Sequence, residues 1–567
     1  MGAMTASDDL RAVCDDYWEA RLQASPLYAS FLGDHRFDDQ ADDLSAGAAQ
    51  GHRTTWTTLR ARVEAIPTTD FDDTDAATHQ LLAQELDEAV RTIDLRLVEL
   101  ASDQMEGPHV DLLMLAAQLR APDPDTAAMA VTRTLAFGTM LDQAAERFRE
   151  GLSAGRTPAR INIERSLNIV DGYLATEVAD DPFVGLTGPE EWDGEAAWRQ
   201  DLTSAVMGEL RPAFARYRAA LADELLPVAR PDDRCGLQWL DDGTELYQAL
   251  IELHTGLPLT PEELHEIGLQ EVNETLPAQY REVGGRQFGT EDLSEIYRHL
   301  LDDPELKYRD GDEILADARA ALDAATEAMG DWFGILPVAP CVLTPVPDFL
   351  AADSPAAYYT PPAPDGSRPG EYHVNLYDAA ARARAETASI AYHEAIPGHH
   401  LQLAIASERT DLPAFRRLSW GHTAFVEGWA LYTERLAEEM GLYASDLDRI
   451  GMLVNDAWRA CRLVVDTGMH ARGWSRQQAV AMMQEHMPVG VDEITVEVDR
   501  YLAIPAQALS YKVGQREILR LRADATARLG EDFDLSGFHD AVLGSSTVSL
   551  PVLGTIVDDW VAARAAA

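Results

Sequence analysis

The chain has 567 residues, 46% of them hydrophobic, which is enough to bury a large core. It carries 96 acidic residues against 46 basic ones, a formal net charge of −50. Nucleic-acid binding needs the opposite sign of charge, so we expect no nucleic-acid partner.

The N-terminal segment does not have the pattern of a signal peptide. Asp8, Asp9 and Arg11 interrupt the stretch where an apolar core would stand. Farther along, no run of about 20 apolar residues predicts a membrane span. The four cysteines lack C-x-x-C spacing, which argues against a disulfide framework or a cysteine-rich metal site. We therefore expect a cytoplasmic protein with no membrane partner.

Helical patterns dominate the chain up to about residue 335, without a motif of recognisable chemistry. One predicted helix begins near residue 261. Thr260 is its N-cap, Pro261 is its first residue, and Glu263 completes a capping box with Thr260. The simplest architecture is a large, mainly α-helical body with two lobes. We predict an N-terminal helical lobe over residues 5–255 and a C-terminal catalytic lobe over residues 256–567.

A proline-rich stretch over residues 335–378 is the one region that predicts strands. Cys341–Leu343 is β-like, and Tyr372–Leu376 alternates apolar with polar side chains, as a half-buried strand does. The second segment stands just before the metal motif described next. We expect a small β-hairpin whose edge strand pairs with an extended peptide, with Asn375 contacting substrate. An ordinary structural hairpin is the alternative.

The most informative segment is His393-Glu394-Ala395-Ile396-Pro397-Gly398-His399-His400. A His-Glu pair followed closely by further histidines is typical of zinc hydrolases, in which imidazoles hold the metal and Glu handles a water proton. The usual motif is H-E-x-x-H, with both histidines on one helical face. Here proline stands at position 397, where the second histidine belongs.

That departure requires the helix to break. On a straight helix His393 and His399 lie roughly 120° apart around the axis, and His393 and His400 lie about 10.5 Å apart along it. Neither pair shares one zinc ion, whose bonds are about 2.0–2.1 Å long. Pro397 and Gly398 supply a break, and two inserted residues return His399 to the usual position. We therefore predict His393 and His399 as ligands, with helix-junction histidines as the alternative.

A third ligand is expected on a later helix. The segment 424–434 is apolar nearly all round, which predicts a buried helix, yet it carries Glu427. A buried carboxylate is costly unless it is paired or bound to metal. Glu427 is therefore the predicted third ligand of one Zn²⁺ ion. Glu434 and His422 are alternatives, the former more typical of an exposed group or a group behind the ligands.

These motifs resemble the bacterial domain of unknown function 885 family, a group expected to contain zinc-dependent peptidases. The resemblance runs from about residue 7 to the C-terminus. It implies a helical fold like that of zincin-type oligopeptidases and carboxypeptidases, and it favours His399 over His400 as ligand. The segments that carry it are His393–Gln402, Glu427–Tyr432, Arg462–His470 with Gly473-Trp474, and Pro505–Gly514.

The expected mechanism places Glu394 as general base, because it neighbours a ligand but points elsewhere. Donors for the developing oxyanion are expected from His470, oriented by Asp466, and from Tyr511. Arg500 and Lys512 are candidates for binding a substrate carboxylate. The substrate is expected to be a peptide or a small amide. The alternatives are a zinc amidase acting on a non-peptide intermediate and a non-catalytic binding protein.

Overall fold

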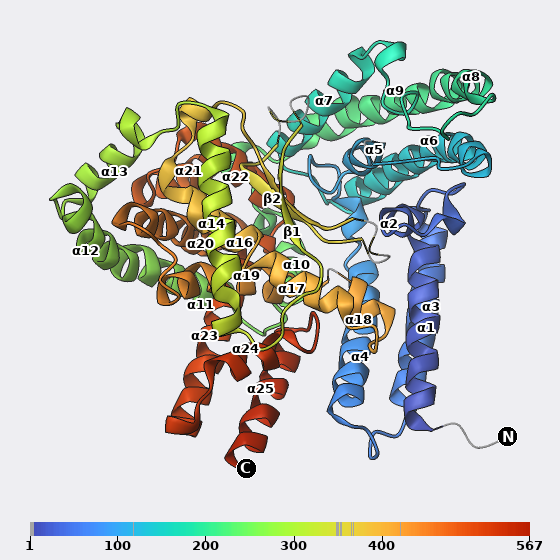
Figure 1. The fold of residues 1–567 in the computed structure, drawn as a ribbon. Coiled ribbons are helices and arrows are strands. Elements are labelled where there is room, and N and C mark those ends of the chain that lie inside the picture. The colour runs from blue at the N-terminus through green and yellow to red at the C-terminus, as the bar shows by residue number, and fades with distance from the viewer. Residues whose placement is uncertain are drawn as a thin grey trace.

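The structure is a computed structural model, and the residues it describes are 5–116, 118–347, 351, 354–363, 366, 368–419 and 421–566. The protein is mainly helical and has one small sheet among these residues. Helices α1 to α9 lie to the right in Figure 1, and the later helices form the larger body to the left. No helix in the described part of the chain is long and apolar enough to cross a membrane.

The α-helices before the sheet cover most of the first 332 residues, and shorter 3₁₀- and π-helical segments connect several of them. They are α1 (Ala6–Ala24), α2 (Pro26–Phe31), α3 (Ala46–Glu64), α4 (Asp73–Asp94), α5 (Pro108–Ala116), α6 (Pro124–Ser153), α7 (Arg160–Ala175), α8 (Glu195–Ala205), α9 (Arg211–Ala219), α10 (Gly243–Thr255), α11 (Pro261–Gln270), α12 (Leu276–Phe288), α13 (Leu293–Asp302) and α14 (Gly311–Trp332). The predicted capping box of Thr260 and Glu263 opens α11.

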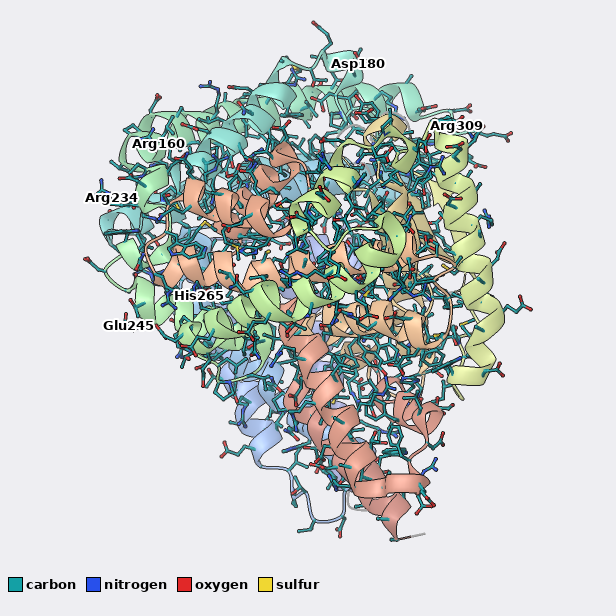
Figure 2. The ribbon with its side chains drawn as sticks, turned by 90° about the vertical axis from the view of Figure 1, so that its left-hand side faces the viewer. Arg160, Asp180, Arg234, Glu245, His265 and Arg309 are labelled. Carbon is teal, nitrogen blue, oxygen red and sulfur yellow. The ribbon has the colours of Figure 1, made fainter. Side chains whose placement is uncertain are left out.

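The helices after the sheet contain all the predicted metal ligands. They are α16 (Thr387–Glu394), α17 (His399–Glu408), α18 (Ala414–Leu418), α19 (Thr423–Glu439), α20 (Asp446–Ala471), α21 (Arg476–His486), α22 (Val491–Ala503), α23 (Ser510–Leu529), α24 (Leu535–Leu543) and α25 (Leu550–Ala565). Charged side chains lie on the outside of the molecule, as Figure 2 shows for Asp180, Arg234 and Arg309.

The sheet corrects two expectations about the strand before the metal motif. Its strands are β1 (Cys341–Pro345), β2 (Ala357–Thr360) and β3 (Gly370–Val374), in the order β1-β3-β2. Strand β3 pairs in parallel with β1 and antiparallel with β2, so it is the central strand and not an edge strand. Its backbone is already paired on both sides, which excludes the expected pairing with a peptide. The strand also ends before Asn375.

Buried apolar clusters connect segments that are far apart in the sequence. One cluster joins α1, α3 and α4 to α19, α23 and α25, through residues that include Tyr17, Trp56, Leu82, Trp429, Ile518 and Leu553. Another packs α14, α16 and α20 against the sheet. A third lies within residues 27–225. The first cluster contains residues from both sides of the expected lobe boundary, which itself stays a prediction.

Two glycines allow α19 and α23 to pack in close contact. A Cβ atom at Gly514 would lie 1.8 Å from the carbonyl oxygen of Ala424 and 2.7 Å from the Cα of Gly428. Farther along, the Gln515 side chain donates to the Leu431 carbonyl, and Arg522 pairs with Glu439. The contacts advance together along both helices, so α19 and α23 run in the same direction.

We predict that Gly514→Ala destabilises the protein, because the methyl group overlaps the backbone of α19. Overpacking of a buried contact typically costs about 1–3 kcal/mol. Gly172→Ala in α7 is the matched control, since its Cβ would meet nothing within 4 Å. That change should be neutral or stabilise by about 0.5–1 kcal/mol. Thermal unfolding compares the two variants, and equal melting temperatures would contradict the close packing.

Candidate metal centre

The predicted helix break is present between α16 and α17. Helix α16 ends at Glu394 and α17 begins at His399, with Gly398 as its N-cap. A Cβ atom at Gly398 would lie 1.8 Å from the carbonyl oxygen of His393, so only glycine fits there. The indole of Trp429 donates to the Pro397 carbonyl at 2.9 Å. The break is therefore fixed by a backbone contact on one side and by α19 on the other.

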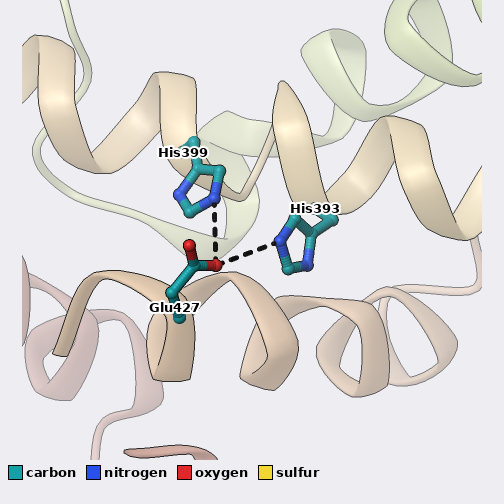
Figure 3. A group of neighbouring side chains, drawn as sticks. All are labelled: His393, His399 and Glu427. Carbon is teal, nitrogen blue, oxygen red and sulfur yellow. Dashed lines mark ion pairs between the residues drawn. The ribbon is translucent and has the colours of Figure 1, made fainter. Parts of the chain in front are cut away.

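The break brings the three predicted ligands together, as Figure 3 shows. Oε2 of Glu427 lies 3.5 Å from Nε2 of His393 and 3.5 Å from Nε2 of His399. The two imidazole rings are nearly perpendicular, with centroids 4.9 Å apart. All three candidate ligand atoms lie within 4.8 Å of one another. Figure 3 shows the two histidines reaching Glu427 from the two halves of the broken helix.

These separations fit one shared zinc ion. Two atoms bound tetrahedrally to zinc lie about 3.3–3.4 Å apart, given bonds of about 2.0–2.1 Å. A direct hydrogen bond is shorter, at about 2.7–3.2 Å. Oε2 of Glu427 is buried without a hydrogen-bond partner among the described residues. An ionised oxygen in that position is costly unless a cation faces it. Two imidazole nitrogens and one carboxylate oxygen are donors that zinc accepts.

Glu434 holds His393 in the orientation that a metal ligand needs. Its Oε1 accepts from Nδ1–H of His393 at 2.8 Å, and its Oε2 accepts from the Ser389 hydroxyl at 2.7 Å. Because Nδ1 donates to Glu434, Nε2 is the nitrogen that faces Glu427 and that a metal ion would bind. Burial by itself would lower the pKa of His393, but Glu427 and Glu434 raise it to about 9. Glu434 is thus buried behind His393 and lies outside the group of candidate ligand atoms.

Glu394 stands beside this centre. It is the last residue of α16, and at about 100° per residue its side chain points away from that of its neighbour His393. Burial raises the pKa of Glu394, and the charge of Glu427 adds to the effect, while His393 and His399 oppose it. The Glu427 side chain is 20% exposed, although its Oε2 is buried.

The two alternative histidines are engaged elsewhere. Nε2 of His400 donates to the Ala339 carbonyl at 3.1 Å, and Nδ1 accepts from the Tyr359 hydroxyl at 2.9 Å. Burial lowers the pKa of His400 to about 4. His422 lies 3.7 Å from Glu85 at the start of α19. Neither belongs to the group of ligand atoms around Glu427.

The expected role of His470 as a substrate donor is corrected by its contacts. Helix α20 continues through Gly468, as its spacing predicted, but His470 is buried. Its Nδ1 accepts from the Leu237 amide at 3.1 Å, and its Nε2 donates to the Tyr501 carbonyl at 3.0 Å. Asp466 does not orient it, because Asp466 bonds to the Tyr247 hydroxyl. Both nitrogens of His470 thus bind the protein backbone.

Two expected substrate contacts are also corrected. The ammonium group of Lys512 is buried and pairs with Asp456 at 2.5 Å, so it has no free charge to offer a substrate. The amide of Asn375 donates to carbonyls of the loop before β2, those of Ala351 and Ser354 among them. Its Oδ1 accepts from the amide of Tyr377. Both residues therefore hold the fold together.

Tyr511 and Arg500 lie next to each other. Nη2 of Arg500 donates to the Tyr511 hydroxyl at 3.4 Å and to Gln507 at 2.9 Å. Because Arg500 donates to this hydroxyl, its own proton is free to donate elsewhere. Tyr511 stands one helical turn before Gly514, which packs against Gly428, the residue after Glu427. The expected role of Tyr511 as an oxyanion donor stays a prediction.

Sequence reasoning missed the contacts that fix the centre from behind. The Ser389 hydroxyl donates to Glu434, the carboxylate that orients His393, and the Trp429 indole donates to the Pro397 carbonyl in the helix break. Nη2 of Arg459 lies 3.7 Å from Glu434. The spacing of Glu434, seven residues after Glu427 on one helix face, had predicted either an exposed group or one behind the ligands. Nothing in the sequence pattern marked Ser389.

We predict that replacing any one ligand with alanine sharply reduces the content of bound metal. Three donors hold the ion, and His393→Ala, His399→Ala or Glu427→Ala leaves only two. His400→Ala is the matched control, since its ring bonds to Ala339 and Tyr359 instead. Elemental analysis after zinc loading and desalting measures the ratio of metal to protein. Full metal content in His399→Ala, with loss in His400→Ala, would show that the ligand assignment is wrong.

We predict that Glu434→Gln weakens zinc binding about 10- to 100-fold, the usual effect of losing a ligand's orienting partner. Glutamine keeps the size of the side chain but not the charge that fixes the proton on Nδ1 of His393. Glu438→Gln, on the exposed side of the same helix, is the control. Competition with a fluorescent zinc chelator gives both affinities. Unchanged affinity in Glu434→Gln would remove its positioning role.

The comparisons with known proteins concern the whole chain. No curated protein matches it. A crystal structure described as "the putative lipoprotein from Colwellia psychrerythraea" is similar at 26% identity and a TM-score of 0.92, over 99% of this chain and 100% of that chain. One described as "a putative lipoprotein of unknown function from Shewanella oneidensis" is similar at 19% identity and a TM-score of 0.75, over 98% and 100%.

The second of these similarities concerns the fold alone, and neither description names an activity. The family described as "Bacterial protein of unknown function (DUF885)" matches residues 26–557. That range includes every residue of the candidate metal centre, as the sequence resemblance led us to expect. The chain belongs to this family.

Proposed function

We propose that this protein is a zinc-dependent hydrolase that cleaves peptide or peptide-like amide bonds. One observation carries the proposal: Nε2 of His393 and Nε2 of His399 each stand 3.5 Å from Oε2 of Glu427. The broken helix delivers the two histidines that an H-E-x-x-H helix delivers in zincin-type peptidases. We also keep a cytoplasmic location as a prediction, which cell fractionation tests, although two similar proteins are described as lipoproteins.

The number of ligands favours catalysis over a structural role. Structural zinc sites close the metal with four protein ligands, whereas catalytic sites use three and leave one position open. The described residues contribute three, and the side chain of Glu427 is 20% exposed. A bound zinc ion supplies Lewis acidity, which polarises a carbonyl oxygen and makes a water molecule acidic near pH 7.

The protein's own residues supply the proton transfer. Glu394 accepts the proton of the attacking water and returns it to the departing amine, as a general base and then a general acid. Its place at the end of α16 sets it beside the ligands without making it one. His393 keeps its tautomer through Glu434, so the metal-binding geometry is ready before substrate arrives.

We predict that Glu394→Gln keeps bound zinc and the fold but loses turnover by about 10²- to 10⁴-fold, since glutamine cannot accept a proton. The assay digests a pool of short peptides with zinc-loaded protein and identifies the products by mass. Glu438→Gln serves as a control with unchanged turnover. Near-normal activity in Glu394→Gln would contradict the mechanism, and a pool left intact by the unaltered protein would contradict the proposed activity on peptides.

A further inference from the structure

One face of α20 carries hydrogen-bond donors that the protein does not use. Asn455, Arg459 and Arg462 follow one another at i, i+4 and i+7, so they share a helix face. Nδ2 of Asn455, Nε of Arg459 and Nη1 of Arg462 are buried and have no hydrogen-bond partner among the described residues. Buried donors are rarely left unpaired, so three on one face point to a missing acceptor.

Aromatic and cationic groups from α22 and α23 complete the surroundings of this face. The Tyr511 ring lies under the guanidinium of Arg462, whose Cζ is 4.3 Å from the ring centroid. Cζ of Arg459 is 5.9 Å from the same centroid. Arg500 from α22 reaches the Tyr511 hydroxyl at 3.4 Å. We call Arg459, Arg462 and Arg500 the arginine cluster. Its outer members are partly accessible, with side chains 14% and 22% exposed for Arg459 and Arg500.

The direct ion pairs of the arginine cluster join its three guanidinium groups to two carboxylates. Glu497 lies 3.0 Å from Arg462 and 3.4 Å from Arg500. Glu434 lies 3.7 Å from Arg459, and that carboxylate is already bonded to His393. Nη1 of Arg459 donates to Oδ1 of Asn455, which leaves its Nε without a partner among the described residues. Guanidinium groups suit carboxylates, which they bind with paired hydrogen bonds.

Two routes connect the arginine cluster to the metal centre. Arg459 is separated from the ligand His393 by a single carboxylate, that of Glu434. Tyr511 stands one turn from Gly514, which contacts Gly428 next to the ligand Glu427. An extended peptide advances about 3.3–3.6 Å per residue, so we infer that a group bound at the cluster belongs to a residue near the bond at the metal.

We propose that the arginine cluster, with Tyr511, binds a carboxylate of the substrate. The inference deepens the proposed hydrolase function and rests on it for the identity of the ligand. It predicts an enzyme that acts near the end of a peptide and reads its free C-terminal carboxylate. This role replaces the one expected of Lys512, whose charge Asp456 neutralises.

The test measures binding to the zinc-loaded Glu394→Gln protein, which removes turnover from the readout. The probes are N-acetylated tripeptides of neutral sequence, offered as free acids, as C-terminal amides, and as amides that carry one aspartate side chain. Arg459→Gln and Arg500→Gln are introduced singly, and Arg500→Lys keeps the charge. Arg520→Gln on α23 is the control, because the Arg520 side chain is 60% exposed and pairs with Glu517. Zinc content and melting temperature are measured for each variant.

We expect the free acid to bind about 10- to 100-fold more tightly than the amide, as a charge-assisted contact typically gives. Arg459→Gln and Arg500→Gln should remove most of that preference, Arg500→Lys should keep part of it, and Arg520→Gln should keep all of it. If the aspartate amide binds like the free acid, the pocket reads any nearby carboxylate.

The carboxylate pocket would be overturned if the free acid and the amide bound equally, or if neither bound. It would also be overturned if the arginine variants lost the same affinity for both peptides. The proposed activity fails separately. If a free-acid peptide binds more tightly than its amide but the unaltered protein never cleaves it, the carboxylate pocket stands and the proposed hydrolase activity is refuted. If peptides are cleaved but the free acid binds no better than the amide, the hydrolase activity stands and the carboxylate pocket is refuted.

Discussion

One carboxylate oxygen, Oε2 of Glu427, sets the constraint on which the rest of the centre depends. It lies buried between two imidazole nitrogens at 3.5 Å from each, without a hydrogen-bond partner among the described residues. A cation between these three atoms removes the cost of that arrangement. The helix break at Pro397 and Gly398 and the close contact of Gly428 with Gly514 both serve to hold the three atoms there.

Alternating charges extend from this centre into α20. Glu427 faces His393, His393 donates to Glu434, and Glu434 lies opposite Arg459. Each charged group therefore has a neighbour of opposite sign as far as the arginine cluster, where donors of Arg459 and Arg462 have no partner among the described residues. We propose that the metal ion supplies the missing cation beside Oε2 of Glu427. The substrate carboxylate supplies the missing anion at the arginine cluster.

The sequence predicted which three residues come together at the candidate centre, because their spacing allows few geometries. Proline and glycine after His393-Glu394 excluded a straight helix and left His399 as the second histidine, and an apolar helix with one acid pointed to Glu427. The roles given to His470, Lys512 and Asn375 could not be tested by pattern alone. Each is polar and lies in or near a motif, but its partners are backbone groups or a buried acid from distant segments, which spacing does not reveal.

The strand topology was mispredicted for a related physical reason. Alternation in Tyr372–Leu376 correctly indicated a half-buried strand, but alternation says nothing of how many neighbours a strand has. The four residues of β2 are too short and too near prolines to give a strand signal, so β3 was taken for an edge. Arg500 and Tyr511 were predicted to contact substrate, but their grouping with Arg459 and Arg462 was missed, because these residues are separated by helical turns and lie on three helices, α20, α22 and α23.

Anomalous X-ray diffraction on crystals of the zinc-loaded protein, recorded on both sides of the zinc absorption edge, tests the central claim most directly. The account predicts one strong peak at about 2.0–2.1 Å from Nε2 of His393, Nε2 of His399 and the carboxylate of Glu427. No peak between these residues, or a peak coordinated by His400 or Glu434 in place of one of them, would contradict it.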